Sequence, residues 1–169
     1  MDTVISGQKN GKACLLVLTE RASREEVIRK IPGKKSTDVI NALNKLEKEL
    51  GAKKFRKKFQ TITMDNGVEF LDNAGIEKSS INKKIPRTTT YYCHPYASGE
   101  RGTNENNNRL IRKFIPKGTN IDEISEKEIQ KVENWINNLP RKLHDGKSAL
   151  MQKKELLNKE KDLLQALNI

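Results

Sequence analysis

The amino-acid sequence predicts an α/β fold in which a mixed sheet of five strands is flanked by helices. Three short segments rich in apolar or β-branched residues come first, and tight turns join them, which is typical of an antiparallel meander. After them the expected order is helix, strand, helix, strand, helix, which favours strands added in parallel. The length of 169 residues suits one compact core.

The five expected strands follow from hydrophobic pattern and turn residues. The clearest is an apolar run, Ala-Cys-Leu-Leu-Val-Leu-Thr, whose composition suits a strand buried on both faces. We expect Cys14 within it to be a small core residue. The strands are expected at 3–6, 13–19, 25–31, 59–64 and 88–93.

Helices are expected where apolar residues recur at helical spacing. The strongest start signal is the capping box of Ser125 and Glu128, and Pro140 ends the helix that follows. We expect Trp135 of this helix to lie in the core, and His144 beyond it to be a surface residue. The expected helices cover 36–50, 69–77, 104–115, 126–139 and 148–167.

The chain is strongly basic, with 33 lysine and arginine residues against 22 acidic residues and a formal net charge of +11. This surplus favours a polyanionic partner, with nucleic acid first and an anionic membrane surface second. The alternative is a lysine-rich composition without a specific partner. No apolar stretch is long enough to cross a membrane, and the first residues lack the apolar region of a signal peptide, so we expect a cytoplasmic protein.

One carboxylate stands where sheets of this class bind ligands. The strand expected at 59–64 runs directly into Asp65, and Asn66-Gly67 lets the chain turn sharply after it. Asp65 is therefore expected at an exposed strand tip. The alternative is that Asp-Asn-Gly is only a turn.

A second polar segment, 94–108, leads into an amphipathic helix. Glu105 falls near the start of that helix, with Asn108 and Arg109 three and four residues further on and Arg112 on the same side. A carboxylate, an amide and guanidinium groups would share one face. The alternative is a solvated first turn, where acidic charge suits a helix N-terminus.

Two blocks of sequence carry a family resemblance. They are Asp-Asn-Gly-Val-Glu-Phe at 65–70 and Pro-Tyr-Ala-Ser-Gly-Glu-Arg-Gly-Thr-Asn-Glu-Asn-Asn-Asn-Arg-Leu-Ile at 95–111. Together they resemble the integrase core of bacterial insertion-sequence transposases, and most closely insertion-sequence family thirty (IS30). Shorter segments at 2–7, 112–119 and 134–141 resemble the same family.

The resemblance implies a ribonuclease-H-like fold and a catalytic triad of two aspartates and one glutamate. Carried over by motif, the triad is Asp2, Asp65 and Glu105. Glu100 is the rival for the third position, because 34 residues separate it from Asp65, which is nearer to the usual family spacing than the 39 before Glu105. Glu105 is preferred because it fits the wider integrase order of glycine, glutamate and asparagine at three-residue steps.

The resemblance also implies two divalent metal ions, Mg²⁺ or Mn²⁺, that activate the nucleophile and stabilise the leaving oxygen in DNA strand cleavage and strand transfer. Hard cations of this kind prefer carboxylate oxygens. Asp65 is expected to contact both ions, and Asp2 and Glu105 are expected to contact one each.

DNA is the expected partner, as transposon ends and target, with a homo-oligomer assembled on it and a nucleoid location in a bacterium by analogy. The catalytic core is expected at 1–145 and a charged helical extension at 146–169. Polar side chains before the Asp65 strand and around the Glu105 helix are expected to hold phosphates without sequence preference. They are Lys53, Lys54, Arg56, Lys57, Lys58, Arg101, Asn108, Arg109, Arg112 and Lys113.

Two other functions stay open from the sequence. The family carries a helix-turn-helix region before its first aspartate, so the chain is alternatively a truncated, inactive fragment that binds DNA or a full-length partner. A ribonuclease-H-type nuclease that acts on RNA–DNA hybrids is the third hypothesis. Metal binding separates the first two functions, and substrate preference identifies the third.

Overall fold

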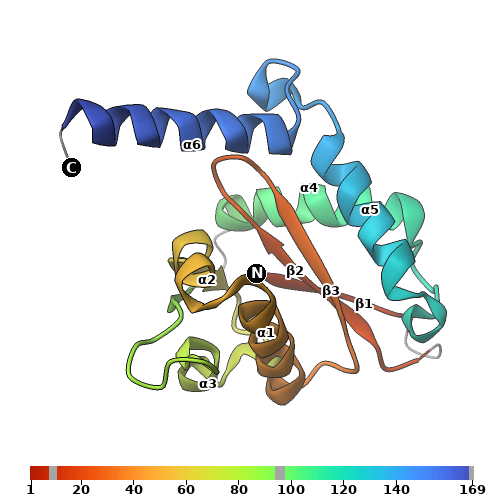
Figure 1. Ribbon diagram of the computed structural model, residues 1–169. Helices are drawn as coiled ribbons and strands as arrows, with labels where there is room; N and C mark the ends of the chain where they lie inside the picture. The colour runs from red at the N-terminus through yellow and green to blue at the C-terminus, as the bar shows by residue number, and fades with distance from the viewer. Residues whose placement is uncertain (8–10, 94–97, 168–169) are drawn as a thin grey trace.

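The computed structural model describes residues 1–7, 11–93 and 98–167, and within this part the side chains of 98–105 are not described. Over these residues there are five strands and six α-helices. The strands and five of the helices follow the expected order, and one short helix was not expected. The helices cover both sides of the strands (Figure 1). This is the α/β architecture that the sequence predicts.

Three strands form an antiparallel sheet in the order β1 (Asp2–Ile5), β2 (Cys14–Thr19) and β3 (Glu26–Ile31). In its register, Asp2 lies opposite Val17. The start of β1, the end of β2 and the start of β3 therefore lie together, and we call this the Asp2 end of the sheet. The predicted meander is confirmed.

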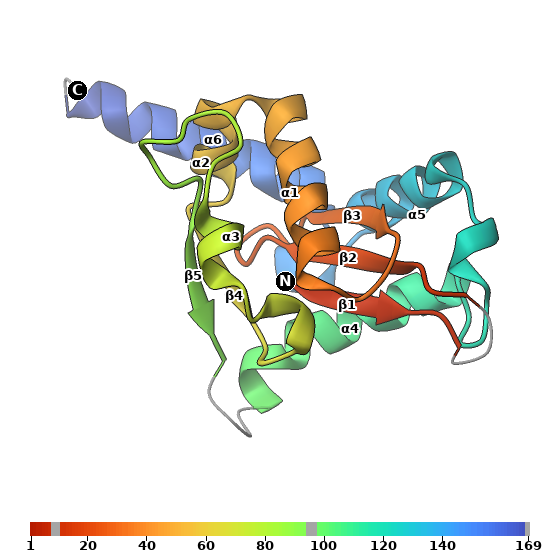
Figure 2. The same cartoon turned by 90° about the horizontal axis from the view of Figure 1, so that it is seen from below.

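Two further strands, β4 (Thr61–Met64) and β5 (Thr89–Tyr92), form a parallel pair. The amino group of Met1 donates to the carbonyl of Thr63 at 2.6 Å, so β4 lies beside the start of β1. Figure 2 shows the pair on the β1 side of the three-stranded sheet. The mixed strand directions are as predicted, although the hydrogen-bond ladders divide the five strands into three and two.

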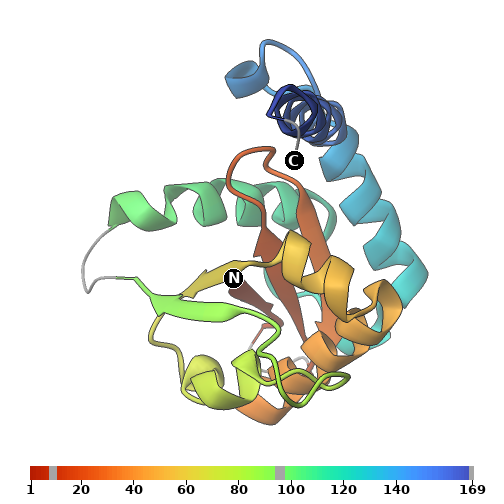
Figure 3. The same cartoon turned by 60° about the vertical axis from the view of Figure 1, so that its left-hand side comes forward.

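β2 is buried along almost its whole length because both of its faces are covered. Leu16 packs in one cluster with α1 (Ser36–Leu50), and Leu15 packs in a second cluster with α4 (Ser98–Phe114) and α5 (Glu126–Asn138). The two clusters place α4 and α5 on one face of β2 and α1 on the other. In Figure 3, α4 (green) crosses the strands above α1 (orange). The continuous apolar run in the sequence is explained by these two opposed cores.

The remaining helices differ from the predictions in their extent. α2 (Ala52–Lys58) contains the basic segment for which no helix was predicted, and Phe55 anchors it in the core. The helix expected at 69–77 is a 3₁₀ turn followed by α3 (Asn73–Glu77). α6 (Ala149–Ala166) extends past α2 and away from the strands (Figure 1). Within the described residues, no helix is both long and apolar enough to cross a membrane.

Two side chains lie in environments that the sequence predicted wrongly. Trp135 is 40% exposed and packs edge-on against Phe114, with 4.7 Å between ring centroids, because α5 turns the face of Ile136 to the sheet instead. His144 is 7% exposed, and its Nε2 lies 3.0 Å from the carbonyl of Ser23. His144 is buried because the loop after α5 folds against the turn between β2 and β3.

Candidate active site

Asp2 and Asp65 lie at neighbouring strand ends. Asp2 opens β1, and Asp65 directly follows β4, whose Thr63 accepts the hydrogen bond from Met1. Burial lowers the pKa of the Met1 amine, and the nearby charges of Asp2 and Asp65 are among those that oppose this shift. The structure therefore brings two of the predicted site residues together at the Asp2 end of the sheet.

The turn after β4 holds the Asp65 carboxylate in place. The backbone N–H of Gly67 donates to Asp65 Oδ1 at 2.9 Å, as in an Asx turn. A β-carbon on Gly67 would lie 2.8 Å from Asp65 Oδ1 and 2.6 Å from Glu69 Oε2, which is closer than such contacts come. Asp-Asn-Gly therefore forms a turn, and the same turn fixes the Asp65 carboxylate at the end of β4.

Glu69 is a carboxylate that the sequence reasoning did not single out. It is 1% exposed, accepts a hydrogen bond from Thr3 Oγ1 at 2.7 Å and pairs with Lys34 Nζ at 3.2 Å. Its Oε2 is buried and has no hydrogen-bond partner among the described residues. Because Thr3 follows Asp2 in β1, Glu69 ties the Asp65 turn to that strand. The available signal was an acidic residue between two apolar neighbours just after the turn.

α4 contacts the start of β1 through Asn108. Asn108 Nδ2 donates to Asp2 Oδ2 at 2.7 Å, while Asp2 Oδ1 accepts the N–H of Thr3 at 2.8 Å. Further along the same helix, Arg112 Nη2 donates to the carbonyl of Ile5 at 2.7 Å. Both oxygens of Asp2 are thus held in a fixed orientation, which ligand side chains at metal sites need.

The third acid of the predicted triad lies in α4. The helix begins at Ser98 rather than at 104, so it contains both glutamate candidates. Glu105 precedes Asn108 by about one helical turn, and Glu100 precedes it by more than two. The side chains of Glu100, Glu105 and Arg101 are outside the described residues, so the choice between the two acids stays a prediction.

The described donors suit a hard divalent cation in their chemistry. Asp2 and Asp65 offer carboxylate oxygens at adjacent strand ends, which Mg²⁺ prefers. Among the side chains that the structure describes, no three histidine, cysteine or acidic groups lie close enough to hold one ion. The two strand carboxylates therefore need a further ligand, and α4 is the element that contacts Asp2.

The basic residues of α2 precede β4, whereas Asp65 follows it. Two of them are ion-paired, Lys58 with Glu25 and Lys57 with Glu160, each at 3.1 Å. Arg56 is partly buried, and its Nη1 has no hydrogen-bond partner in the described part of the chain. The two exposed cations of α2 with no ion pair among the described residues are Lys53 and Lys54. Contact of this group with DNA stays a prediction.

Three basic residues of α4 follow Asn108, which donates to Asp2, along the same helix. Arg109 and Lys113 are exposed, and Arg109 Nη2 also donates to Asn106 Oδ1 at 2.8 Å. Arg112 is partly buried by its bond to β1. Their contact with DNA also stays a prediction.

A buried polar cluster adjoins the same end of the sheet. Thr19 Oγ1 lies 3.0 Å from both carboxylate oxygens of Glu26, which is fully buried at the start of β3. Burial raises the pKa of Glu26 to about 7, against the opposing effects of the Thr19 bond and the charge of Arg141. Arg141 Nη1 donates to Asn107 Oδ1 at 3.2 Å. The sequence reasoning missed this cluster because its members come from four separate segments.

The curated relatives of this chain are transposases. The transposase of insertion sequence element IS4351 from Bacteroides fragilis is 39% identical over 142 residues, which are 84% of this chain and 40% of that protein. Transposase InsI of insertion sequence element IS30C from Escherichia coli K12 is 34% identical over 139 residues, which are 82% of this chain and 33% of that protein. The chain thus spans at most about two fifths of the length of these relatives. No family model matches the chain.

Solved structures with the same fold are catalytic cores of retroviral integrases. The HTLV-2 integrase catalytic core domain in complex with magnesium has a TM-score of 0.60 at 20% identity, covering 89% of this chain and 90% of that one. The catalytic core domain of BIV integrase has a TM-score of 0.64 at 17% identity, covering 95% of each chain. The predicted ribonuclease-H-like fold is confirmed.

Proposed function

Because this chain belongs with the integrase-type cores of IS30-family transposases, we propose that it is the catalytic domain of a DNA transposase. Its reaction is cleavage of a DNA strand followed by transfer of that strand to a target. The observation that carries the proposal is the convergence of Asp2, Asp65 and Asn108 from three separate elements. Phosphodiester chemistry assisted by two metal ions requires carboxylates collected in this way.

We assign metal binding to Asp2, Asp65 and Glu105. The hydrogen bond from Asn108 to Asp2 supports Glu105 over Glu100, because Glu105 lies about one helical turn from Asn108 whereas Glu100 lies more than two turns away, about 12 Å along the axis of α4. Two bound Mg²⁺ or Mn²⁺ ions would supply an activated nucleophile and charge stabilisation at the leaving oxygen. The HTLV-2 integrase core, which shares the fold, is in complex with magnesium.

The other residues of the site orient these ligands and hold the substrate. Gly67 fixes one oxygen of Asp65, and Asn108 fixes one oxygen of Asp2. Glu69 braces the turn against β1 through Thr3. Because neighbouring carboxylates repel one another, this bracing keeps the ligands in position before cations arrive.

The substrate in this proposal is DNA, as two transposon ends and a target, on which copies of the chain assemble as a homo-oligomer. The exposed cations of α4 would contact its backbone phosphates. Residues 1–145 form the core in this proposal, and residues 146–169 form a charged extension. Lys153 of the extension is ion-paired to Glu25 of the core at 2.8 Å.

Strand transfer with matched variants tests the proposal. Labelled duplexes carrying the ends of the element are incubated with the protein and Mg²⁺ or Mn²⁺, and joined products are resolved on a sequencing gel. Asp65→Asn and Glu105→Gln are expected to abolish joining, while Glu100→Gln retains it. Equal joining by Asp65→Asn and wild type would overturn the function, and loss in Glu100→Gln alone would move the third ligand to Glu100.

DNA binding without catalytic activity is the competing function. It predicts saturable DNA binding with no response to metal. A rise in melting temperature with Mn²⁺ that disappears in Asp65→Asn would exclude this alternative. Cleavage of RNA–DNA hybrids in preference to DNA would instead support the nuclease.

A further inference from the structure

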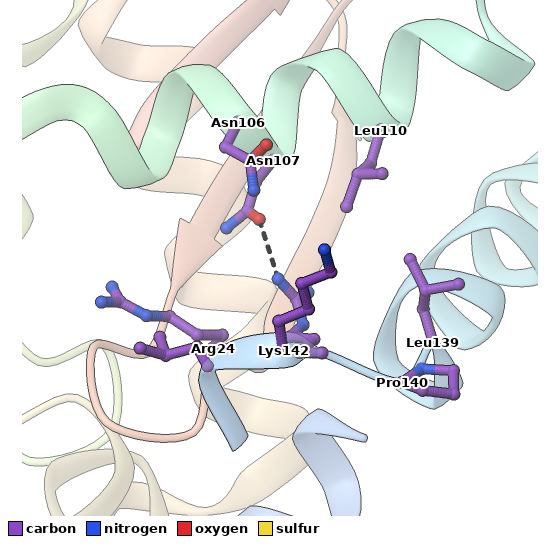
Figure 4. A pocket seen from close by; sticks show the side chains of 9 residues that line it. Arg24, Asn106, Asn107, Leu110, Leu139, Pro140 and Lys142 are labelled. Carbon is purple, nitrogen blue, oxygen red and sulfur yellow. Dashed lines mark hydrogen bonds between the residues drawn. The ribbon is translucent and has the colours of Figure 1, made fainter. Parts of the chain in front are cut away.

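A pocket of about 400 Å³ lies beside the proposed active site. Asn106, Asn107 and Leu110 of α4 line one wall of it. Arg24, in the turn between β2 and β3, and residues 139–143, after α5, line the others (Figure 4). Three segments that are distant in sequence therefore enclose one space.

The pocket and the carboxylates share the Asp2 end of the sheet. Asp2 pairs with Val17 of β2, and the turn that carries Arg24 follows the end of that strand. On α4, Asn107 lines the pocket while its neighbour Asn108 bonds to Asp2. Because the Cα atoms of adjacent residues lie about 3.8 Å apart, the pocket wall at Asn107 is on the order of 10 Å from the Asp2 carboxylate that Asn108 contacts. A DNA strand held at the carboxylates would reach it within a few nucleotides.

The pocket is positively charged. Arg24, Arg141 and Lys142 line it, and no carboxylate does so among the described residues. Lys142 is exposed, and Figure 4 shows it reaching from its loop toward α4. The excess of cations in one small volume favours an anionic ligand.

The guanidinium of Arg141 uses only part of its hydrogen-bonding capacity within the described part of the protein. Its Nη1 donates to Asn107, but Nε and Nη2 are buried and have no hydrogen-bond partner in the described part of the chain. Burial lowers the pKa of Arg141, and the charge of Glu26 opposes that shift. Because the pKa of Glu26 is about 7, this carboxyl carries only part of its charge at neutral pH. Anionic oxygens in the pocket would recover hydrogen bonds that Arg141 loses on burial.

We propose that this pocket binds a backbone phosphate of the DNA strand, with Arg141 and Lys142 as its ligands. The inference rests on the proposed function, since it takes DNA as the substrate. Nε and Nη2 of Arg141 are buried in the unbound protein, so phosphate binding requires the guanidinium to rotate toward the pocket. In that orientation the planar guanidinium offers two parallel N–H donors to the phosphate oxygens. Leu110 and Leu139 line the remaining volume, which suits the sugar of the same nucleotide.

DNA binding without metal tests the pocket separately from catalysis. Lys142→Gln and Arg141→Gln are compared with Lys131→Gln, which removes an exposed cation of α5 outside the pocket. The readout is fluorescence anisotropy of a labelled duplex in EDTA over a series of salt concentrations. Each pocket variant is expected to reduce the slope of log affinity against log salt by about 1, and the control is expected to leave it unchanged.

A second measurement separates direct contact from a general loss of charge. Single neutral methylphosphonate groups are placed at successive positions of the duplex strand. At the phosphate that the pocket holds, this replacement is expected to weaken binding by wild type but not by Lys142→Gln. Lys142 is exposed, so this variant keeps the fold even where Arg141→Gln does not.

The outcomes distinguish this inference from the proposed function. Equal slopes for the pocket variants and Lys131→Gln would overturn the inference, and so would a lack of DNA binding by wild type. If the slopes are equal while Asp65→Asn abolishes strand transfer, the pocket assignment fails and the proposed function stands. If the pocket variants lose the contact while Asp65→Asn joins strands like wild type, the proposed function fails and the pocket assignment stands.

Discussion

Replacing Glu26 by glutamine is expected to remove a pH dependence of stability between about pH 4.5 and 7. Glu26 is 0% exposed, and burial raises the pKa of its carboxyl from 4.5 to about 7. The folded chain therefore keeps this proton in a range where the unfolded chain has lost it, so the stability of the wild type falls as pH rises through the window. Glutamine keeps an oxygen for the Thr19 hydroxyl and carries no charge.

The magnitude follows from the change in proton affinity. A rise from 4.5 to about 7 corresponds to about 3 kcal/mol of unfolding free energy, at roughly 1.4 kcal/mol for each tenfold change in affinity. Below the window both side chains are neutral, and the free energies of unfolding should be similar. Above it, Glu26→Gln should be more stable than wild type by about 3 kcal/mol relative to that baseline.

Urea unfolding followed by circular dichroism across the pH range measures this difference. The matched control is Glu126→Gln, because Glu126 is an exposed glutamate whose only ion pair among the described residues is with Lys45 at 3.4 Å. Its stability should follow the wild type at every pH. Parallel profiles for Glu26→Gln and wild type would refute the reasoning, since they would mean that Glu26 is ionised in the folded chain throughout the window.

Three further substitutions test the site and its support. Asn108→Ala removes the 2.7 Å hydrogen bond to Asp2 and is expected to weaken Mn²⁺ binding about tenfold or more. Titration calorimetry measures this affinity, and an unchanged value would contradict the prediction. Gly67→Ala is expected to lower the Mn²⁺ affinity as well, because its β-carbon would lie 2.8 Å from Asp65 Oδ1 and displace that carboxylate. An affinity equal to that of the wild type would mean that the turn accommodates the methyl group without moving Asp65. Arg87→Met is expected to cost about 3–5 kcal/mol of unfolding free energy, because it leaves the fully buried Glu47, now paired at 3.5 Å, without its countercharge. Chemical denaturation measures that cost, and a loss below about 1 kcal/mol would count against a stabilising role for the ion pair.

Local sequence signals predicted most secondary-structure elements, because their causes lie within a few residues. α1 has the predicted bounds, since its apolar spacing and Gly51 define both the helix and its end. The capping box of Ser125 and Glu128 is present at the start of α5. Both features depend on neighbouring backbone and side-chain groups alone.

The environments of single side chains were predicted less well. Trp135 lies on an amphipathic helix, but which side of the apolar stripe faces the sheet depends on how α5 packs against β3. His144 is buried because a loop distant in sequence folds over the turn that contains Ser23. Neither packing relation leaves a periodic pattern in the sequence.

The sequence by itself determined the order of the strands along the chain and the place of Asp65 at a strand tip. Through its family motif it also predicts Asp2 and Glu105 as metal ligands, and that assignment stays a prediction. These depend on local residue patterns and on sequence motifs, both of which can be recognised in the amino-acid sequence alone. Only the tertiary structure decided that Asn108 holds Asp2, that Glu69 braces the Asp65 turn and that Arg141 meets Asn107 in a cationic pocket. Each of these contacts joins segments brought together by burial of the two cores on either side of β2, and burial energy depends on the whole fold rather than on neighbours in sequence.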